Sequence, residues 1–191
     1  MSPKERSVLT EGGNVPKAIF LDRDGTINED VGPLFTPDKL HFIPGSLEAL
    51  RRLQEHFLLF IVTNQSAIGN KLFHVEDFEE FDEYFQGRLQ EAGVKITHTY
   101  CCPHAKEENC LCYKPQTYFL KAAAKDYDIA LDQSYVIGDH PHDVSMGQRA
   151  GAKTIYVLSG HGQKHQEELV IKPDFIAHAL NEATEWILKR T

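Results

Sequence analysis

The segment Lys17-Ala-Ile-Phe-Leu21, followed at once by Asp22-Arg-Asp-Gly-Thr26, decides the fold. A short apolar run bounded by Pro16 and Asp22 predicts a buried strand. Two carboxylates two residues apart follow it directly, and they repel each other unless a cation lies between them. Gly25 allows a sharp turn there. The segment predicts a strand that ends in a site for a hard cation such as Mg²⁺; a solvated acidic turn is the alternative.

The rest of the chain alternates between predicted strands and predicted helices. Apolar runs predict further strands at 57–62, 94–100, 134–137, 154–158 and 174–177, the last at an edge. Capping residues and helical spacing of apolar residues predict helices at 46–53, 74–93, 118–127, 144–150 and 180–188. This alternation predicts an α/β fold, a doubly wound parallel sheet with helices on both faces. Too few residues separate the elements for a large cap domain.

Length and composition limit the class of protein. At 191 residues, with 41% hydrophobic and 25% charged residues, the chain is expected to form a single domain over 1–191, with a flexible tail at 1–15. A formal charge of −8 without a Lys/Arg cluster argues against nucleic-acid or anionic-membrane partners. No apolar run approaches a membrane span, and the start lacks a secretory h-region, so we expect a cytoplasmic protein. A monomer is the default expectation.

Further polar residues follow the other predicted strands, where ligands of such sheets bind. Thr63-Asn-Gln-Ser66 offers neutral donors suited to phosphate oxygens, although such residues also serve as loop and cap residues. Lys114 can supply a positive charge to a phosphoryl group, although a lone lysine is most often a surface residue. Asp139 and Asp143 add two carboxylates that can complete the metal site, although Asp143 is also a plausible helix cap.

Taken together, these four motifs resemble those of the haloacid dehalogenase-like phosphohydrolases. The matching residues are Asp22-Arg-Asp-Gly-Thr26, Thr63, Lys114 and Gly138-Asp139 with Asp143. The resemblance covers residues 17–160 and implies a Mg²⁺-dependent phosphatase that acts on a small phosphorylated metabolite.

The resemblance also implies a role for each motif residue. Asp22 is expected to attack phosphorus and form an aspartyl-phosphate, and Asp24 to act as general acid and then as general base. Thr63 and Lys114 are expected to hold the phosphoryl oxygens. Mg²⁺ is expected to be held by Asp22, the backbone carbonyl of Asp24, Asp139 and Asp143. Substrate contacts are expected from Asp30, Asn64, Gln65, Ser66, Tyr113 and His140.

All four cysteines fall in one short stretch, which is unlike a disulfide framework. Cys102-Pro-His104 followed by Cys110-Leu-Cys112 suits tetrahedral Zn²⁺, and with four protein ligands the site would be structural. We therefore predict a zinc loop at 101–113; free buried thiols are the alternative. Cys101 is expected to be a core residue at the end of the preceding strand.

The zinc loop narrows the resemblance to small capless phosphatases, a group that includes heptose bisphosphate phosphatases and histidinol-phosphatase domains. Tyr113 and His140 stand where the heptose bisphosphate group carries arginine and lysine, and the zinc loop is shorter than in that group. Since tyrosine cannot fork onto a second phosphate, the number of phosphates recognised stays open. Histidinol phosphate or another monophosphate, a phosphotransferase activity, and an inactive phosphate-binding relative are the alternatives.

The remaining histidines and aromatics receive ordinary interpretations. His142 is interpreted as a surface histidine, and His161 and His165 as residues of a polar loop without an evident partner. Phe78 and Phe81 are expected on the core face of a helix.

Overall fold

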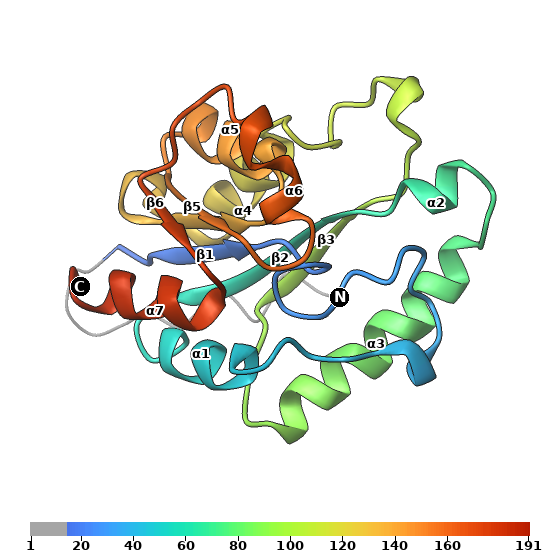
Figure 1. Cartoon of the computed structure of the whole chain (residues 1–191), viewed down its shortest axis with the longest axis horizontal. Coiled ribbons are helices and arrows are strands. Elements are labelled where there is room, and N and C mark those ends of the chain that lie inside the picture. The colour runs from blue at the N-terminus through green and yellow to red at the C-terminus, as the bar shows by residue number, and fades with distance from the viewer. Residues whose placement is uncertain (1–14) are drawn as a thin grey trace.

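The computed structural model describes residues 15–191, so the tail predicted at 1–15 lies almost wholly outside the described residues. The described part folds around one six-stranded sheet in the order β3-β2-β1-β4-β5-β6 (Figure 1). The strands are β1 (Ala18–Leu21), β2 (Leu58–Asn64), β3 (His98–Cys102), β4 (Tyr135–Gly138), β5 (Lys153–Val157) and β6 (Phe175–Ala177). All five strand pairs are parallel, which confirms the predicted sheet.

Helices cover both faces of the sheet, as the doubly wound prediction requires. They are α1 (Ser46–Leu53), α2 (Ser66–Gly69), α3 (Val75–Glu91), α4 (Tyr118–Tyr127), α5 (Pro141–Ala150), α6 (Gly162–His165) and α7 (Leu180–Leu188). Single 3-10 turns lie at Pro37–Lys39, Lys106–Glu108, Leu131–Gln133 and Gln166–Glu168. Helices α1, α3 and α7 pack on one face, and α4 and α5 pack on the other (Figure 1).

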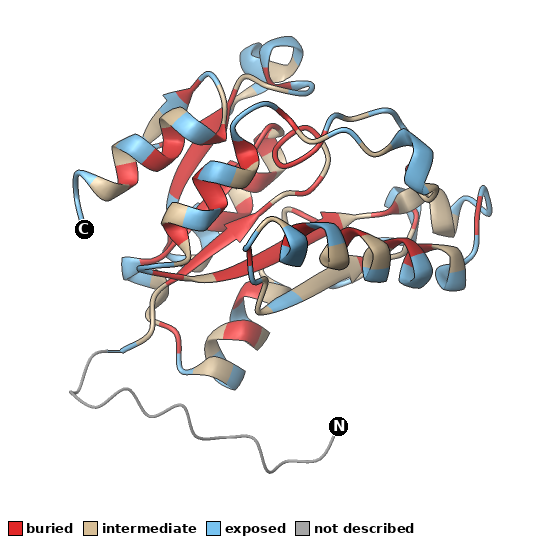
Figure 2. Cartoon of the chain, turned by 90° about the horizontal axis from the view of Figure 1, so that it is seen from below, coloured by how far each residue is buried: buried red, intermediate tan, exposed pale blue. Residues whose placement is uncertain are grey.

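The side chains of β1 point alternately to the two faces of the sheet, so they belong to two apolar clusters. Ile19 and Leu21 belong to the apolar cluster on the side of α1, α3 and α7, whereas Ala18 and Phe20 belong to the cluster with α4 and α5. All four are fully buried, because helices cover both sides of the strand (Figure 2). The buried strands thereby fix where the residues that follow them emerge.

Three local predictions need correction. The strand predicted at 94–100 begins only at His98: the amide of Val94 bonds Leu89 at the end of α3, so this apolar residue closes the helix. The capping pattern predicts Ser46 as the N-cap of the helix at 46–53, but Ser46 is the first residue of α1 and the N-cap is Gly45, in a left-handed conformation. The sequence analysis also missed α2, a single turn after β2.

Candidate active site

Three carboxylates meet at the carboxyl ends of the central strands. Asp22 follows β1, Asp139 follows β4, and Asp143 lies in the first turn of α5. Because β1 and β4 are parallel neighbours, their last residues emerge side by side. One oxygen from each of these carboxylates lies within 4.8 Å of the others. The prediction that these three residues come together is confirmed.

Lys114 reaches the same cluster from the segment before α4. Its Nζ lies 2.9 Å from Oδ2 of Asp22 and 2.8 Å from Oδ1 of Asp143, and its side chain is almost fully buried. Its backbone N–H donates to Oδ1 of Asn64 at the end of β2, which ties the lysine to the sheet. Three carboxylates and one ammonium leave a formal charge of −2 in a buried site.

Burial, together with the neighbouring charges, shifts the pKa values of this cluster. Burial raises the pKa of Asp22 well above its ordinary value; Lys114 opposes that rise, and Asp143 and Asp139 add to it. Burial likewise raises the pKa of Asp139 to about 7. Burial alone would lower the pKa of Lys114, but Asp143 and Asp22 outweigh it and hold that pKa above its ordinary value. The two raised carboxylate pKa values indicate a site that is incomplete without a cation.

Three glycines lie so close to the carboxylates of the cluster that a side chain at these positions would displace them. A Cβ atom on Gly25 or on Gly160 would collide with the carboxylate of Asp139, and one on Gly138 would collide with Asp143. Gly25 has φ +79°, which confirms the predicted sharp turn.

The donor set fits Mg²⁺. Mg²⁺ takes oxygen ligands at about 2.1 Å in octahedral geometry, which places neighbouring ligand oxygens roughly 3–4 Å apart. The three carboxylates approach this spacing, and their charge matches a divalent ion after Lys114 is counted. The backbone carbonyl of Asp24 as a further ligand stays a prediction.

The predicted acid/base residue, Asp24, is held by side chains around it. Gln65 donates from Nε2 to Oδ2 of Asp24 at 3.0 Å and to Oγ1 of Thr63 at 2.9 Å. Because the amide nitrogen fills an acceptor position of Thr63, the hydroxyl hydrogen is left to donate elsewhere. The amide hydrogens of Gln65 are thus engaged by two predicted catalytic residues, and its expected role as a substrate contact stays a prediction.

A polar cavity of about 660 Å³ opens above these groups. The six expected substrate contacts all line it: Asp30, Asn64, Gln65, Ser66, Tyr113 and His140. Asp22, Asp24, Thr63, Lys114 and Asp139 line it as well, so the predicted catalytic and substrate residues share one space.

Three histidines of this cavity were not expected there. His161 donates its backbone N–H to Oδ2 of Asp139 at 2.8 Å, and its imidazole Nδ1 lies 3.1 Å from Oδ2 of Asp30. His142 and His165 also line the cavity, at its wall with His140. The position of His161 shortly after β5 could have identified it, since the other site residues also follow strands.

A second cluster joins the last residue of β3 to the loop that follows, and this loop stands away from the sheet (Figure 1). Sγ of Cys102 lies 3.4 Å from Sγ of Cys110 and 3.2 Å from Sγ of Cys112, and Nδ1 of His104 lies 3.6 Å from Cys102 and 3.4 Å from Cys112. Two sulfurs on a tetrahedral Zn²⁺ at about 2.3 Å stand roughly 3.7 Å apart, whereas a disulfide needs about 2.05 Å. These four residues fit Zn²⁺.

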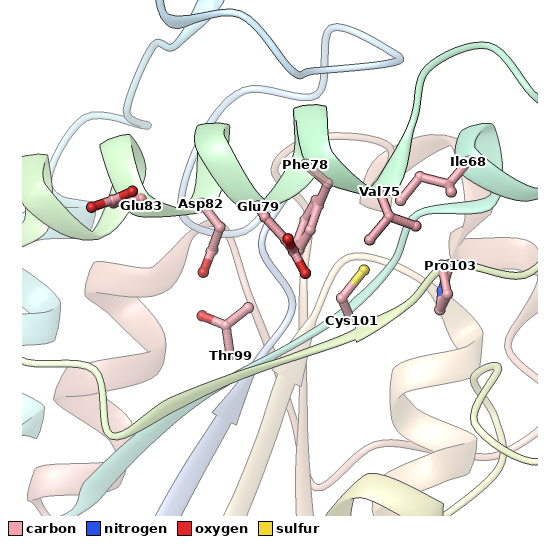
Figure 3. A pocket seen from close by; sticks show the side chains of 9 residues that line it. All are labelled: Ile68, Val75, Phe78, Glu79, Asp82, Glu83, Thr99, Cys101 and Pro103. Carbon is pink, nitrogen blue, oxygen red and sulfur yellow. The ribbon is translucent and has the colours of Figure 1, made fainter. Parts of the chain in front are cut away.

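The remaining cysteine, Cys101, takes no part in that cluster, and it is partly buried, not the core residue that was expected. It lines a separate cavity of about 440 Å³ between α3 and β3, together with Asp82 and Thr99 (Figure 3). Burial raises the pKa of its thiol to about 12, so this cysteine stays protonated. The expectation that Cys102, and not Cys101, belongs to the metal cluster agrees with the geometry.

Comparisons with known proteins find similar phosphatases. The HAD-hydrolase-like family model matches residues 111–183. The D-glycero-beta-D-manno-heptose-1,7-bisphosphate 7-phosphatase of Helicobacter pylori is 37% identical over 164 residues, which cover 85% of this chain and 95% of the relative. The enzyme of the same name from Haemophilus ducreyi is 36% identical over 179 residues, which cover 90% of this chain and 98% of the relative.

A solved structure has a similar fold. The D,D-heptose 1,7-bisphosphate phosphatase of B. bronchiseptica, complexed with magnesium and phosphate, superposes with a TM-score of 0.85. It is 28% identical, and the match covers 92% of this chain and 99% of that one.

Proposed function

This chain belongs to the haloacid dehalogenase-like hydrolases, and from that premise we propose that it is a Mg²⁺-dependent phosphatase of small phosphorylated sugars. D-glycero-D-manno-heptose 1,7-bisphosphate, cleaved at the 7-phosphate, is the first substrate that the relatives suggest. The observation that carries the proposal is the buried cluster of three carboxylates and Lys114 beneath a polar cavity.

The acidic cluster is suited to a metal-assisted phosphoryl transfer. Asp22, Asp139 and Asp143 would hold Mg²⁺, with the backbone carbonyl of Asp24 as the expected further ligand. When bound, Mg²⁺ supplies positive charge that offsets the repulsion between an anionic nucleophile and an anionic phosphate.

Three side chains act on the phosphoryl group in the first half of the reaction. An oxygen of Asp22 attacks phosphorus, the bond to the leaving oxygen breaks, and an aspartyl-phosphate forms. Lys114, held at 2.9 Å from Asp22, lies where it also attracts the phosphoryl oxygens. Thr63 has a hydroxyl hydrogen free to donate to one of those oxygens, because Gln65 occupies its acceptor position.

Asp24 moves the proton in both halves of the reaction. As a carboxylic acid it gives its proton to the leaving oxygen, and as a carboxylate it then takes a proton from water. The water oxygen bonds to phosphorus, the bond to Asp22 breaks, and the free nucleophile is restored. Asp24 lines the cavity from the segment after β1, beside the nucleophile and within reach of bound substrate.

One observation favours a second candidate, a phosphatase of monophosphates such as histidinol phosphate. Lys106 and Lys114 are the only lysines or arginines among the residues that line the cavity within the described part of the chain. Burial lowers the pKa of His140 to about 4, so this imidazole is neutral at pH 7. Tyr113 brings no charge either. A second phosphate would therefore meet few cations, whereas a single phosphate at Lys114 needs no more.

Phosphate release with Mg²⁺ tests the proposal and separates the two candidates. The panel comprises both anomers of the heptose bisphosphate, histidinol phosphate, and simple sugar and polyol monophosphates, each repeated in EDTA. The proposal predicts Mg²⁺-dependent release, with the heptose bisphosphate preferred. Preference for a monophosphate would select the second candidate, and a lack of release from the whole panel would contradict both.

A further inference from the structure

The side chain of Arg23 lies next to the predicted acid/base residue but belongs to none of the motif roles described above. It is fully buried, although a guanidinium is always charged and costly to bury without partners. Its Nε lies 3.2 Å from Oδ1 of Asp24, and its Nη2 lies 2.8 Å from Oδ2. The planar guanidinium thus grips both oxygens of one carboxylate in the bidentate geometry that fixes orientation most strongly.

Two aromatic rings hold the guanidinium from the side of α3. Its Cζ lies 5.2 Å from the ring centre of Phe81 and 5.7 Å from that of Phe78. Both rings belong to the core face of α3, and Phe78 extends from this helix toward β3 (Figure 3). Arginine stacked against aromatic faces gains attraction and loses freedom to rotate. The helix therefore sets the position of the fork, and the fork sets the plane of the Asp24 carboxylate.

The other contacts of Asp24 explain why the fork matters. An ionised carboxylate offers about four acceptor positions. Arg23 supplies two N–H donors, and Asn28 and Gln65 supply one each, at 2.8 Å to Oδ1 and 3.0 Å to Oδ2. A proton on Asp24 must displace one donor. The side-chain amides of Asn28 and Gln65 each donate to one oxygen of Asp24, whereas the guanidinium of Arg23 donates to both. The guanidinium therefore keeps the carboxylate plane fixed when the hydrogen bond from either amide breaks.

We propose that Arg23 is a positioning residue, which holds the Asp24 carboxylate in the orientation from which it exchanges its proton with the leaving oxygen and with water. This inference rests on the proposed function, since it assigns a partner to the acid/base residue of that reaction. It predicts that loss of the fork impairs proton transfer selectively, while attack by Asp22 continues.

Leaving groups that differ in their need for a proton give the test. A sugar alkoxide must be protonated as it leaves, whereas p-nitrophenolate leaves without a proton. In Arg23→Met, which fills the same slot without fork or charge, we expect kcat for the sugar phosphate to fall about 100-fold. The first turnover of p-nitrophenyl phosphate should slow by less than about threefold, and a burst of nitrophenolate should precede slow turnover limited by the second step.

Control variants separate positioning from a merely structural role. Phe85→Leu alters a buried ring of the same helix other than the two rings against the guanidinium, Phe78 and Phe81, so it should leave the rate ratio between the two substrates as in wild type. Arg23→Lys, which keeps the charge without the fork, should fall between Arg23→Met and wild type. Both rates are measured in one sample, so the ratio does not depend on the fraction of folded chains.

An equal loss in the first-turnover rates of both substrates, with no burst of nitrophenolate, would overturn the positioning role of Arg23 while leaving the proposed function intact. Wild-type protein that releases phosphate from neither substrate would overturn the proposed function, and this inference with it.

Discussion

The two metal-ligand clusters lie at the same edge of the molecule but are built in opposite ways. The acidic cluster of Asp22, Asp139 and Asp143 is anchored on β1, β4 and α5, and Lys114 and the wall of a cavity adjoin it. The thiol cluster of Cys102, His104, Cys110 and Cys112 spans the end of β3 and a loop that has one short 3-10 turn. The first cluster offers hard oxygens to an open cavity, and the second offers soft atoms that enclose a tetrahedral centre.

This difference separates catalysis from structure. The strands position the three carboxylates whether or not a metal is bound. Burial and mutual repulsion disfavour the charged carboxylates, and a bound cation would offset both effects. Leu111 of the thiol loop is exposed and does not pack into the core, so a metal bound there would itself hold this part of the loop in place. Loss of the acidic cluster should therefore abolish activity, whereas loss of the thiol cluster should weaken the fold.

Asp22→Asn should reduce phosphate release below about 1% of the wild-type rate, because an amide cannot serve as the nucleophile. The fold should survive, since the substitution removes one of three crowded charges and Lys114 keeps Asp143 as its partner. Steady-state kinetics and thermal melting in EDTA check the two parts. A residual rate above about 1% of the wild-type rate would remove Asp22 from the role of nucleophile.

Cys110→Ser should abolish zinc binding and weaken the fold, because structural sites need all four ligands. Metal analysis of wild type should find about one zinc per chain, and the variant should lose it and melt roughly 4–8 °C lower, which corresponds to about 2 kcal/mol. Cys101→Ser is the matched control: it alters the neighbouring cysteine outside the cluster and should retain zinc. Equal zinc loss in both variants would contradict the assignment.

Most of this comparison could be predicted from the sequence, because its signals are local. Strand β1 and the turn at Gly25 follow from an apolar run and from a residue that tolerates positive φ. The thiol cluster follows from ligand spacing alone. Contacts that depend on tertiary packing could not be predicted from the sequence. Arg23 follows a strand like an ordinary polar loop residue, and only the packing of α3 places the rings of Phe78 and Phe81 against its guanidinium.

The pH dependence of Mg²⁺ stabilisation should report the charge of the acidic cluster. The pKa of Asp139 is raised from 3.8 to about 7 in the folded protein, so the metal-free fold binds this proton more tightly than the unfolded chain does. Its contribution to stability is present below pH 4 and is lost as the pH rises toward 7, on the order of 4 kcal/mol. Stabilisation by Mg²⁺ should therefore increase over the same range.

Melting curves between pH 4.5 and 7.5, with EDTA or with Mg²⁺, check this expectation. Asp139→Asn is the control: its pH dependence should be weaker, with the raised pKa of Asp22 accounting for part of what remains, and its stabilisation by Mg²⁺ should be smaller than in wild type. If Mg²⁺ stabilised the variant as strongly as wild type, Asp139 would not be a ligand.

Tyr113→Arg should have the smallest effect and should act on specificity. An arginine at this cavity position adds a charged fork where the described lining has few cations, so it favours a second phosphate. We expect kcat/KM for the bisphosphate to rise about threefold to tenfold relative to a monophosphate, equivalent to about 1 kcal/mol. An unchanged ratio would place Tyr113 away from the distal end of the substrate.

The contacts of the cavity histidines also could not be predicted from the sequence. His161 was interpreted as a loop residue without a partner, yet it contacts both Asp139 and Asp30. These contacts join segments that follow β5, β4 and β1, and no sequence spacing relates them. Only the order of the strands in the sheet brings the three segments together.

Selective removal of one metal tests the division of roles most directly. Wild-type protein is dialysed against a chelator mild enough to remove Mg²⁺ while zinc stays at about one per chain, and phosphate release is measured before and after Mg²⁺ is restored. The account predicts no activity in the zinc-only protein and full recovery on addition of Mg²⁺ alone. Activity that persists with zinc alone, or that returns with zinc and not with Mg²⁺, would contradict it.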